Sequence, residues 1–381
     1  MKVLYVSYQD PFGVGGGSYA SHAYLKAFSQ LAEGNIDIVI AEECDETKDT
    51  TIVYKNIYKV PQRNKFIRTI ALINGVLHRY NNTVKRLLRC NDVKYDYIVF
   101  SGCFMGGSLA HISKKRGVIP ITIHHNYEPE YFRDNMNDGL MKNIIISHVC
   151  RSERRAYLNS DLNFFLTSSD MKKFEEVYGT CKGENFLIAT FEYNDDYSIK
   201  QYNHERDLLT FIITGALNNM QGVDGVRFFF DYLYAKLPSN CKVIVAGKSP
   251  TAEVIKLCSQ FNNVELIASP KDMNSILDKA DVYICPTRLG GGMKLRVMDG
   301  LKHGLPVLTH ECSARGYDLF FGNRAFKIFN TAEEFEIQLN QLLKDKESGL
   351  INRDKVLNIY RINFSLKAGR ERIQEALKSY S

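Results

Sequence analysis

The chain has 381 residues, of which 45% are hydrophobic, and a formal net charge of +6. This length suits two or three globular domains, and the composition is that of an ordinary folded protein. The nine cysteines are odd in number and scattered without a Cys-x-x-Cys pair, which argues against a disulfide scaffold and a zinc module. No apolar run is long enough to cross a bilayer and no signal peptide is recognisable, so we expect a cytoplasmic protein.

The first half of the chain alternates predicted strands with predicted helices. Each strand is a short apolar run of the kind that is buried in a parallel sheet, and the runs span residues 3–7, 36–40, 97–101, 119–123 and 162–167. Strands that alternate with helices in this way favour an α/β domain of the Rossmann type.

A glycine-rich loop, residues 10–18, follows the first strand and precedes a helix predicted over 19–31. The loop ends in Gly15, Gly16, Gly17 and Ser18. Its backbone and the free N–H groups of the helix are suited to contact a diphosphate or an acceptor hydroxyl. A tight structural turn is the competing interpretation, because the spacing is not Gly-x-Gly-x-x-Gly.

Residues 63–89 contain seven Lys and Arg residues and no acid. Apolar residues recur there at helical spacing, among them Tyr80, Val84 and Leu87. One interpretation is a pair of core-facing helices with a solvated basic face. The other is a segment that rests on an anionic membrane surface. Nucleic-acid binding is disfavoured, because no module for it is recognisable.

Residues 124–128 follow the fourth strand of this half, where Rossmann folds place ligand-contacting loops. They include His124, His125, Asn126 and Glu128. A neutral imidazole can donate from one nitrogen and accept at the other, which suits contact with a sugar. A histidine held by core or capping hydrogen bonds is the alternative. Metal binding is less favoured, because adjacent histidines point in different directions and no third ligand has zinc spacing.

The second half repeats the alternation, with strands predicted at residues 209–214, 242–246, 264–267, 282–285 and 306–309. We therefore predict a second Rossmann-like domain. The polar stretch 192–206 between the halves is the predicted linker.

Residues 286–308 are the most informative segment, and they indicate a strand, a glycine loop, a helix and another strand. Gly290, Gly291 and Gly292 let the backbone approach a ligand, and the N-terminus of a helix that starts near Met293 stabilises phosphate oxygens. Lys294 adds a positive charge. Asp299, a little over one turn further along, is placed to accept hydrogen bonds from the hydroxyls of a ribose.

This array of proline, arginine, three glycines, two basic residues, an acid and Gly-x-Pro-Val resembles the nucleotide-sugar site of glycosyltransferases with the GT-B fold, specifically family 4 (glycosyl transferases group 1). Asp299 stands where glutamate is usual and Gly300 where alanine is usual. The resemblance implies an α/β protein of two Rossmann-like domains that face each other across a cleft. It places the acceptor-side domain at 1–195, the nucleotide-sugar-binding domain at 205–358, and a C-terminal helix at 360–381 that crosses back to the first domain.

The resemblance also implies roles for individual residues. His125 and Glu128 are the expected catalytic residues, the first beside the donor sugar and the second orienting the acceptor or a neighbouring loop. The acceptor side would be lined by Gly15, Ser18, His124 and Asn126. The donor would be bound by Gly16, Gly17, Gly215, Arg288, Gly290, Gly291, Gly292, Met293, Lys294, Arg296 and Asp299.

The activity that the resemblance implies is that of a hexosyltransferase, which moves a sugar from a nucleoside diphosphate sugar to a carbohydrate or lipid-linked glycan. UDP is slightly favoured as the nucleotide. The product would belong to surface polysaccharide or glycoconjugate synthesis. By resemblance the reaction retains anomeric configuration and uses no metal or cofactor. We expect a cytoplasmic enzyme that is peripheral at the inner face of the plasma membrane if 63–89 contacts lipid.

Three other classes of protein stay open. Ala216 and Gln221 stand where many family members carry a basic clamp for the pyrophosphate, so a non-catalytic partner subunit is one alternative. A nucleotide-sugar epimerase of similar shape is another. A nicotinamide-dependent dehydrogenase is the third, because Glu42 and Glu43 lie near the end of the second strand.

Overall fold

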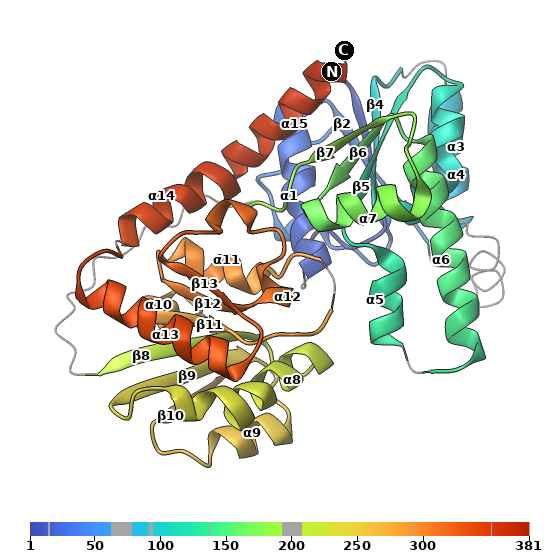
Figure 1. Ribbon diagram of the computed structural model, residues 1–381. Helices are drawn as coiled ribbons and strands as arrows, with labels where there is room; N and C mark the ends of the chain where they lie inside the picture. Colours follow the sequence, from blue (N-terminus) through green and yellow to red (C-terminus); the bar gives the residue numbers. More distant parts are fainter. Residues whose placement is uncertain are drawn as a thin grey trace. The chain divides into compact units, whose positions relative to one another are not determined.

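The structure is a computed structural model that describes residues 1–13, 16–61, 78–90, 94–136, 138–192, 208–290, 292–351 and 353–380. It divides into two compact units (Figure 1). Unit 1 comprises Met1–Asp195 and Phe364–Ser381, and unit 2 comprises Asp196–Asn363. Most of the predicted linker, residues 193–206, lies outside the described residues.

Unit 1 is built on a seven-stranded parallel sheet with the strand order β3-β2-β1-β4-β5-β6-β7. The strands are β1 (Val3–Ser7), β2 (Ile36–Ala41), β3 (Asn56–Val60), β4 (Tyr97–Ser101), β5 (Ile119–His124), β6 (Leu162–Phe165) and β7 (Glu184–Leu187). The sequence did not predict β3 and β7. Both are edge strands whose side chains are largely half-buried or exposed, so neither has the continuous apolar run that marks a central strand.

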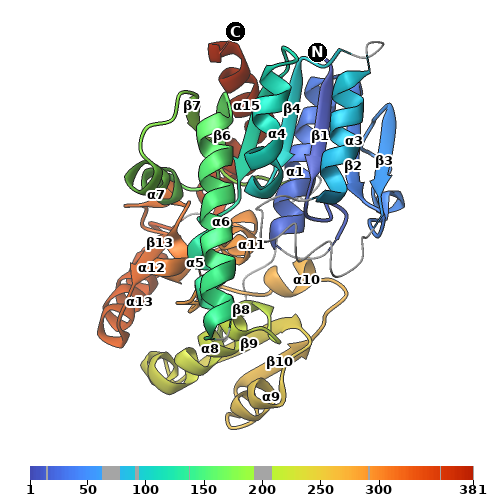
Figure 2. The same cartoon turned by 90° about the vertical axis from the view of Figure 1, so that its right-hand side faces the viewer.

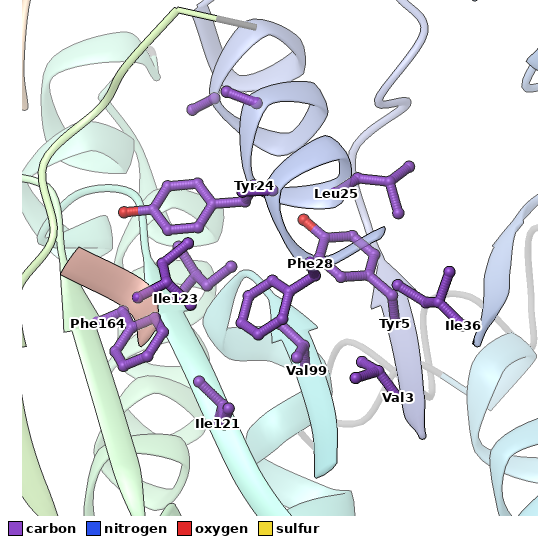
Figure 3. Close-up of a cluster of buried hydrophobic side chains, with 14 of the residues drawn as sticks. Val3, Tyr5, Tyr24, Leu25, Phe28, Ile36, Val99, Ile121, Ile123 and Phe164 are labelled. Atoms are coloured by element: carbon purple, nitrogen blue, oxygen red, sulfur yellow. The ribbon is translucent and has the colours of Figure 1, made fainter. Parts of the chain in front are cut away.

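Helices cover both faces of this sheet (Figure 2). They are α1 (Gly16–Leu31), α3 (His78–Arg89), α4 (Cys103–Lys114), α5 (Glu128–Asn135), α6 (Leu140–Asn159), α7 (Ser168–Tyr178) and α15 (Leu366–Tyr380), with a short 3-10 turn η1 (Glu46–Lys48). Because side chains alternate along a strand, Val3 and Tyr5 of β1 enter one core cluster and Leu4 and Val6 enter another. In the first cluster the rings of Tyr5, Phe28 and Phe164 gather between α1 and the sheet (Figure 3).

The described part of the basic segment supports the core-facing interpretation. Helix α3 covers its second half, and Tyr80, Val84 and Leu87 are buried in the core cluster that also holds Leu4. Its apolar face is therefore unavailable for a membrane. Residues 62–77 lie outside the described part of the chain.

Unit 2 has a six-stranded parallel sheet with the order β10-β9-β8-β11-β12-β13. The strands are β8 (Leu209–Ala216), β9 (Cys241–Lys248), β10 (Val264–Ala268), β11 (Val282–Cys285), β12 (Val307–His310) and β13 (Phe326–Phe329). The helices are α8 (Met220–Phe228), α9 (Ala252–Cys258), α10 (Asn274–Leu277), α11 (Leu295–Lys302), α12 (Glu311–Ala314), α13 (Ala332–Glu347) and α14 (Arg353–Phe364), with short turns η2 (Phe229–Leu233), η3 (Tyr234–Lys236) and η4 (Asp318–Phe320).

In both sheets the strand order reverses direction once, between β1 and β4 in unit 1 and between β8 and β11 in unit 2. Ligands of doubly wound folds bind outside the carboxyl ends of the strands at such a point. The two glycine loops follow β1 and β11, so each lies at the switch point of its own sheet.

The C-terminal segment forms two helices where the sequence predicted one. The break is at Ser365, whose hydroxyl accepts a hydrogen bond from the N–H of Ala368 at 3.1 Å and so begins α15 as a new helix. Helix α15 packs against α1 within unit 1. Gly369 lets α15 approach Phe191 closely, because a Cβ there would lie 2.2 Å from the Phe191 ring. No helix within the described ranges is long and apolar enough to span a membrane.

Candidate functional site

The glycine loop of unit 2 joins β11 to α11 and depends on glycine at two described positions. Gly290 and Gly292 have φ angles of 85° and 68°, a region that other residues rarely adopt. Gly291 lies outside the described residues. Helix α11 begins at Leu295, two residues later than predicted, and Lys294 is its N-cap residue without a capping side-chain hydrogen bond. The N–H of Val297 donates to the Lys294 carbonyl oxygen at 3.0 Å, so an anion at this helix end would contact the N–H groups of Leu295 and Arg296.

Lys294 is buried beneath this loop, with only 7% of its surface exposed. Its Nζ donates to the carbonyl oxygen of Gly290 at 2.8 Å, and its own carbonyl oxygen accepts from the hydroxyl of Tyr317 at 2.8 Å. Burial lowers the pKa of Lys294 to about 8. The ammonium group therefore remains mostly protonated at pH 7 and fixes a positive charge under the loop.

Arg296 brings a second cation to the carboxyl end of β8. Its Nη1 donates to the hydroxyl of Thr287 at 2.9 Å. The guanidinium lies on Gly215, where a Cβ would come within 2.8 Å of its central carbon. The absence of a side chain at Gly215 therefore leaves space for Arg296. The loop that begins here carries Ala216 and Gln221 where basic residues were expected, so Arg296 brings a positive charge to it. The Gln221 amide lies against Gly290, where a Cβ would be 2.2 Å from its nitrogen.

Arg288 is held on α8. Its Nε and Nη2 donate to the two carboxylate oxygens of Asp224 at 2.9 and 3.0 Å, and its guanidinium stacks on the ring of Phe228 at 4.7 Å. Two hydrogen bonds and one stacking contact therefore hold the Arg288 guanidinium within unit 2. Met293 packs beside Gly316, which has a φ of 86°.

Asp299 lies over the ends of the two central strands, β8 and β11. Its Oδ2 accepts from the hydroxyl of Thr214 at 3.4 Å, and that hydroxyl also bonds to the hydroxyl of Tyr283 at 2.8 Å. Thr214 and Tyr283 are buried residues of β8 and β11. Their contact with Asp299 was not predictable, because Thr214 lies 85 positions from Asp299 along the chain.

Gly300 stands where alanine is usual in family 4, and the nearby ring of Tyr283 explains this difference. A Cβ at position 300 would lie 2.7 Å from Cγ of the Tyr283 ring.

We expect Gly300→Ala to lower the free energy of unfolding by about 1 kcal/mol, because overpacking costs about 1–3 kcal/mol and alanine regains about 1 kcal/mol of helix propensity. Urea unfolding measures this. Asn340→Ala, at an exposed position of α13, is the control and should not destabilise; an equal or higher stability for Gly300→Ala would contradict this account.

In unit 1, the glycine loop is packed against residues that precede and follow it. Helix α1 begins at Gly16, earlier than predicted. A Cβ on Gly17 would lie 1.6 Å from the side-chain oxygen of Gln9, so the Gln9 amide covers this glycine. Ser18 lies beside Gly13. Gly15 lies outside the described residues.

His125 ends a chain of buried hydroxyls at the carboxyl ends of the central strands. Its Nε2 bonds to Ser101 Oγ at 3.0 Å, and that oxygen bonds to Ser21 Oγ at 2.9 Å. Burial lowers the pKa of His125 to about 4, so the ring is neutral at pH 7. Its buried Nδ1 has no hydrogen-bond partner among the described residues. Ser101 and Ser21 were not predicted, because only the fold brings them to His125.

His124, which the resemblance assigns to the acceptor side, is packed among aromatic side chains. Its ring stacks on Phe165 at 4.9 Å between centroids and packs edge-on against Phe174 at 4.6 Å, and its Nε2 bonds to Asn163 Oδ1 at 3.0 Å. Only 1% of its surface is exposed. Adjacent residues at a strand end point to opposite faces, so the two buried rings have different surroundings, aromatic side chains for His124 and hydroxyl groups for His125.

Glu128 starts α5 and is buried among other acids. Burial raises its pKa to about 7, a hydrogen bond from the Asn126 side chain opposes that rise, and the charge of Asp170 adds to it. Its backbone N–H donates to Glu153 Oε1 at 2.9 Å. Burial also holds the pKa of Glu153 well above its usual range. The two buried acids therefore both favour their neutral forms more than exposed carboxyl groups do.

Comparisons with known proteins agree with this architecture. Residues 209–345 match the family model described as "Glycosyl transferases group 1". A 44.6 kDa protein in the cps region of Klebsiella pneumoniae is 23% identical over 341 residues, covering 83% of this chain and 84% of the relative. The structure of Anabaena Alr3699/HepE in complex with UDP-glucose superposes on this chain with a TM-score of 0.70 and 12% sequence identity, over 100% of both chains. The lipopolysaccharide outer core galactosyltransferase WaaB superposes with a TM-score of 0.68 and 12% identity, also over 100% of both chains.

The two doubly wound sheets, the glycine loop before α11 and these similarities define a glycosyltransferase of the GT-B type. The match of residues 209–345 to the glycosyl transferases group 1 model confirms the resemblance that residues 286–308 carry.

Proposed function

We propose that this glycosyltransferase moves a sugar from a UDP-sugar to a carbohydrate or lipid-linked glycan. The observation that carries the proposal is the cationic setting of the loop before α11, in which the buried Lys294 and the guanidinium of Arg296 accompany the N–H groups of the first two helix residues. This combination suits a diphosphate, which needs several hydrogen-bond donors and positive charge. UDP is the favoured nucleotide because Anabaena HepE, a structural neighbour, is a complex with UDP-glucose.

Unit 2 would stabilise the leaving diphosphate without a metal ion. As the bond between sugar and phosphate breaks, negative charge develops on the diphosphate, and preorganised N–H groups and cations offset it. Lys294 and Arg296 are held in place by the Gly290 carbonyl and the Thr287 hydroxyl, so little reorganisation is needed. Asp299, supported by Thr214, would accept hydrogen bonds from the ribose hydroxyls.

Unit 1 would supply His125 and Glu128. The unpartnered Nδ1 of the neutral His125 ring would contact a hydroxyl of the donor sugar. Glu128, with its pKa raised to about 7, would orient the acceptor hydroxyl and, in its ionised form, accept the proton that this hydroxyl loses as its oxygen bonds to the anomeric carbon. The reaction would retain the configuration of the anomeric carbon, as the resemblance to family 4 implies.

The acceptor belongs to surface polysaccharide or glycoconjugate synthesis in this proposal. Two relatives support this class: one lies in a cps region, and another is named a lipopolysaccharide outer core galactosyltransferase.

The test is release of UDP from UDP-glucose and UDP-galactose in the presence of EDTA, with and without bacterial glycan acceptors. We expect acceptor-dependent release that persists in EDTA, with product anomers of the donor's configuration by NMR. UDP binding without any turnover would instead favour a non-catalytic partner subunit. Turnover that stops in EDTA and returns with Mg²⁺ would contradict the metal-independent mechanism.

A further inference from the structure

A helical hairpin formed by α5 and α6 extends beyond the end of the unit 1 sheet (Figures 1 and 2). Helix α6 packs against α4 and α5, using buried residues that include His148, Val149, Ser152 and Ala156. The start of α6, where the hairpin turns, has a different character. Its large apolar side chains are exposed: 79% for Leu140, 66% for Met141 and 39% for Ile144, with 41% for Tyr131 of α5. We call these four residues the hairpin tip.

Further along α6, beyond the hairpin tip, lie three arginines, Arg151, Arg154 and Arg155, which we call the stem. Leu140, Ile144, Ser147, Arg151 and Arg155 recur every three or four residues, so they share one face of α6. Arg151, Arg154 and Arg155 are exposed and form no salt bridge within the described ranges. The acid of α6, Glu153, is buried on the opposite side. The exposed face of the stem is therefore positive.

The spacing of these two regions matches the depth of a membrane surface. Arg151 follows Ile144 by seven positions, which is about 10 Å along a helix. Interfacial segments bury their apolar side chains by roughly 5–10 Å while basic groups remain at the head groups. Tyr131, with an apolar ring and a polar end, suits the same boundary.

We propose that the hairpin tip inserts into the surface of a bilayer and that Arg151, Arg154 and Arg155 contact its anionic lipid head groups. This surface differs from residues 63–89, whose described half buries its apolar face in the core. The proposal goes beyond the transfer reaction, because binding to vesicles is measured without donor or acceptor. It would hold unit 1 at a membrane in which a lipid-linked acceptor resides.

The chain contains no tryptophan, which permits a site-specific probe. We expect the emission of Leu140→Trp to shift to shorter wavelength when phosphatidylglycerol-containing vesicles are added. Pure phosphatidylcholine vesicles should produce a much smaller shift. Ile337→Trp, at a position that is 65% exposed on α13 of unit 2, is the control and should not respond. No shift for Leu140→Trp, or an equal shift for Ile337→Trp, would overturn the proposal.

Co-sedimentation with the same vesicles tests the two regions separately. Arg151→Glu with Arg155→Glu should weaken binding by at least roughly 30-fold, since each basic residue contributes about fivefold. The control is the double variant Lys115→Glu with Arg116→Glu, which changes the net charge by the same amount at exposed positions of unit 1. It should bind the vesicles much more tightly than the Arg151→Glu, Arg155→Glu variant. Equal losses in both pairs would mean that net charge alone is responsible and would sink the proposal.

Replacement of the apolar tip completes the test. Leu140→Ser, Met141→Ser and Ile144→Ser together should weaken vesicle binding by at least roughly tenfold. Exposed apolar residues of unit 2 provide the matched control, Ile255→Ser with Ile337→Ser and Ile362→Ser. If the tip variant instead converts a lipid-free dimer into a monomer and binds vesicles normally, the tip contacts a second copy of this chain and the membrane proposal is wrong.

Discussion

Arg296→Ala is expected to weaken UDP binding by roughly 10- to 100-fold, because a charge-assisted hydrogen bond contributes about 1.5–3 kcal/mol. Arg296 is the cation that occupies the space over Gly215, at the start of the loop that carries Ala216 and Gln221 in place of basic residues. The affinity for uridine, which has no phosphate, should stay nearly unchanged. Calorimetric titration of both ligands measures the two effects.

Two variants control for this prediction. Arg296→Lys keeps the charge but loses the planar fork of donors, so we expect an intermediate affinity. Arg288→Ala removes a cation that is already paired with Asp224, so its effect should be smaller than that of Arg296→Ala. An Arg288→Ala variant that loses more UDP affinity than Arg296→Ala would assign the diphosphate to a different group.

His125→Ala is expected to lower kcat by roughly 100- to 10,000-fold, the usual effect of removing a positioned hydrogen-bonding or acid–base group. UDP affinity should change little, because the diphosphate is assigned to unit 2. The neutral ring is held by Ser101, so Ser101→Ala should lower kcat by a smaller factor while leaving His125 in place. Initial rates with a saturating donor measure both variants.

The neighbouring histidine provides the matched comparison. His124 packs among aromatic rings, so His124→Ala should chiefly lower the free energy of unfolding. If His124→Ala stays fully stable and His125→Ala retains normal kcat, the assignment of the two histidines is wrong.

The sequence predicted the central strands of both sheets because they are continuous apolar runs, which burial on both faces of a parallel sheet requires. It missed the edge strands β3, β7 and β13. Lys59 and Lys327 interrupt two of these, and edge positions tolerate such residues because one side of the strand is open. The helix break at Ser365 depends on a single capping hydrogen bond, which the apolar periodicity does not reveal.

The donor loop was predictable as a motif because its residues are contiguous, and glycine, lysine and arginine each have a clear reason to be there. The supporting contacts were not predictable. Arg296 on Gly215 and Thr214 under Asp299 join residues that are about 80 positions apart, and parallel strand pairing alone brings them together. Which of two adjacent histidines faces the core also depends on the register of β5 between its neighbours.

The most direct measurement is calorimetric titration of the whole chain with UDP and with uridine, both in EDTA. We expect UDP to bind at least roughly tenfold more tightly than uridine, because the N-terminus of α11, Lys294 and Arg296 act only on the diphosphate. Equal affinities, or UDP binding that appears only when a divalent metal is added, would contradict a metal-independent diphosphate site in unit 2.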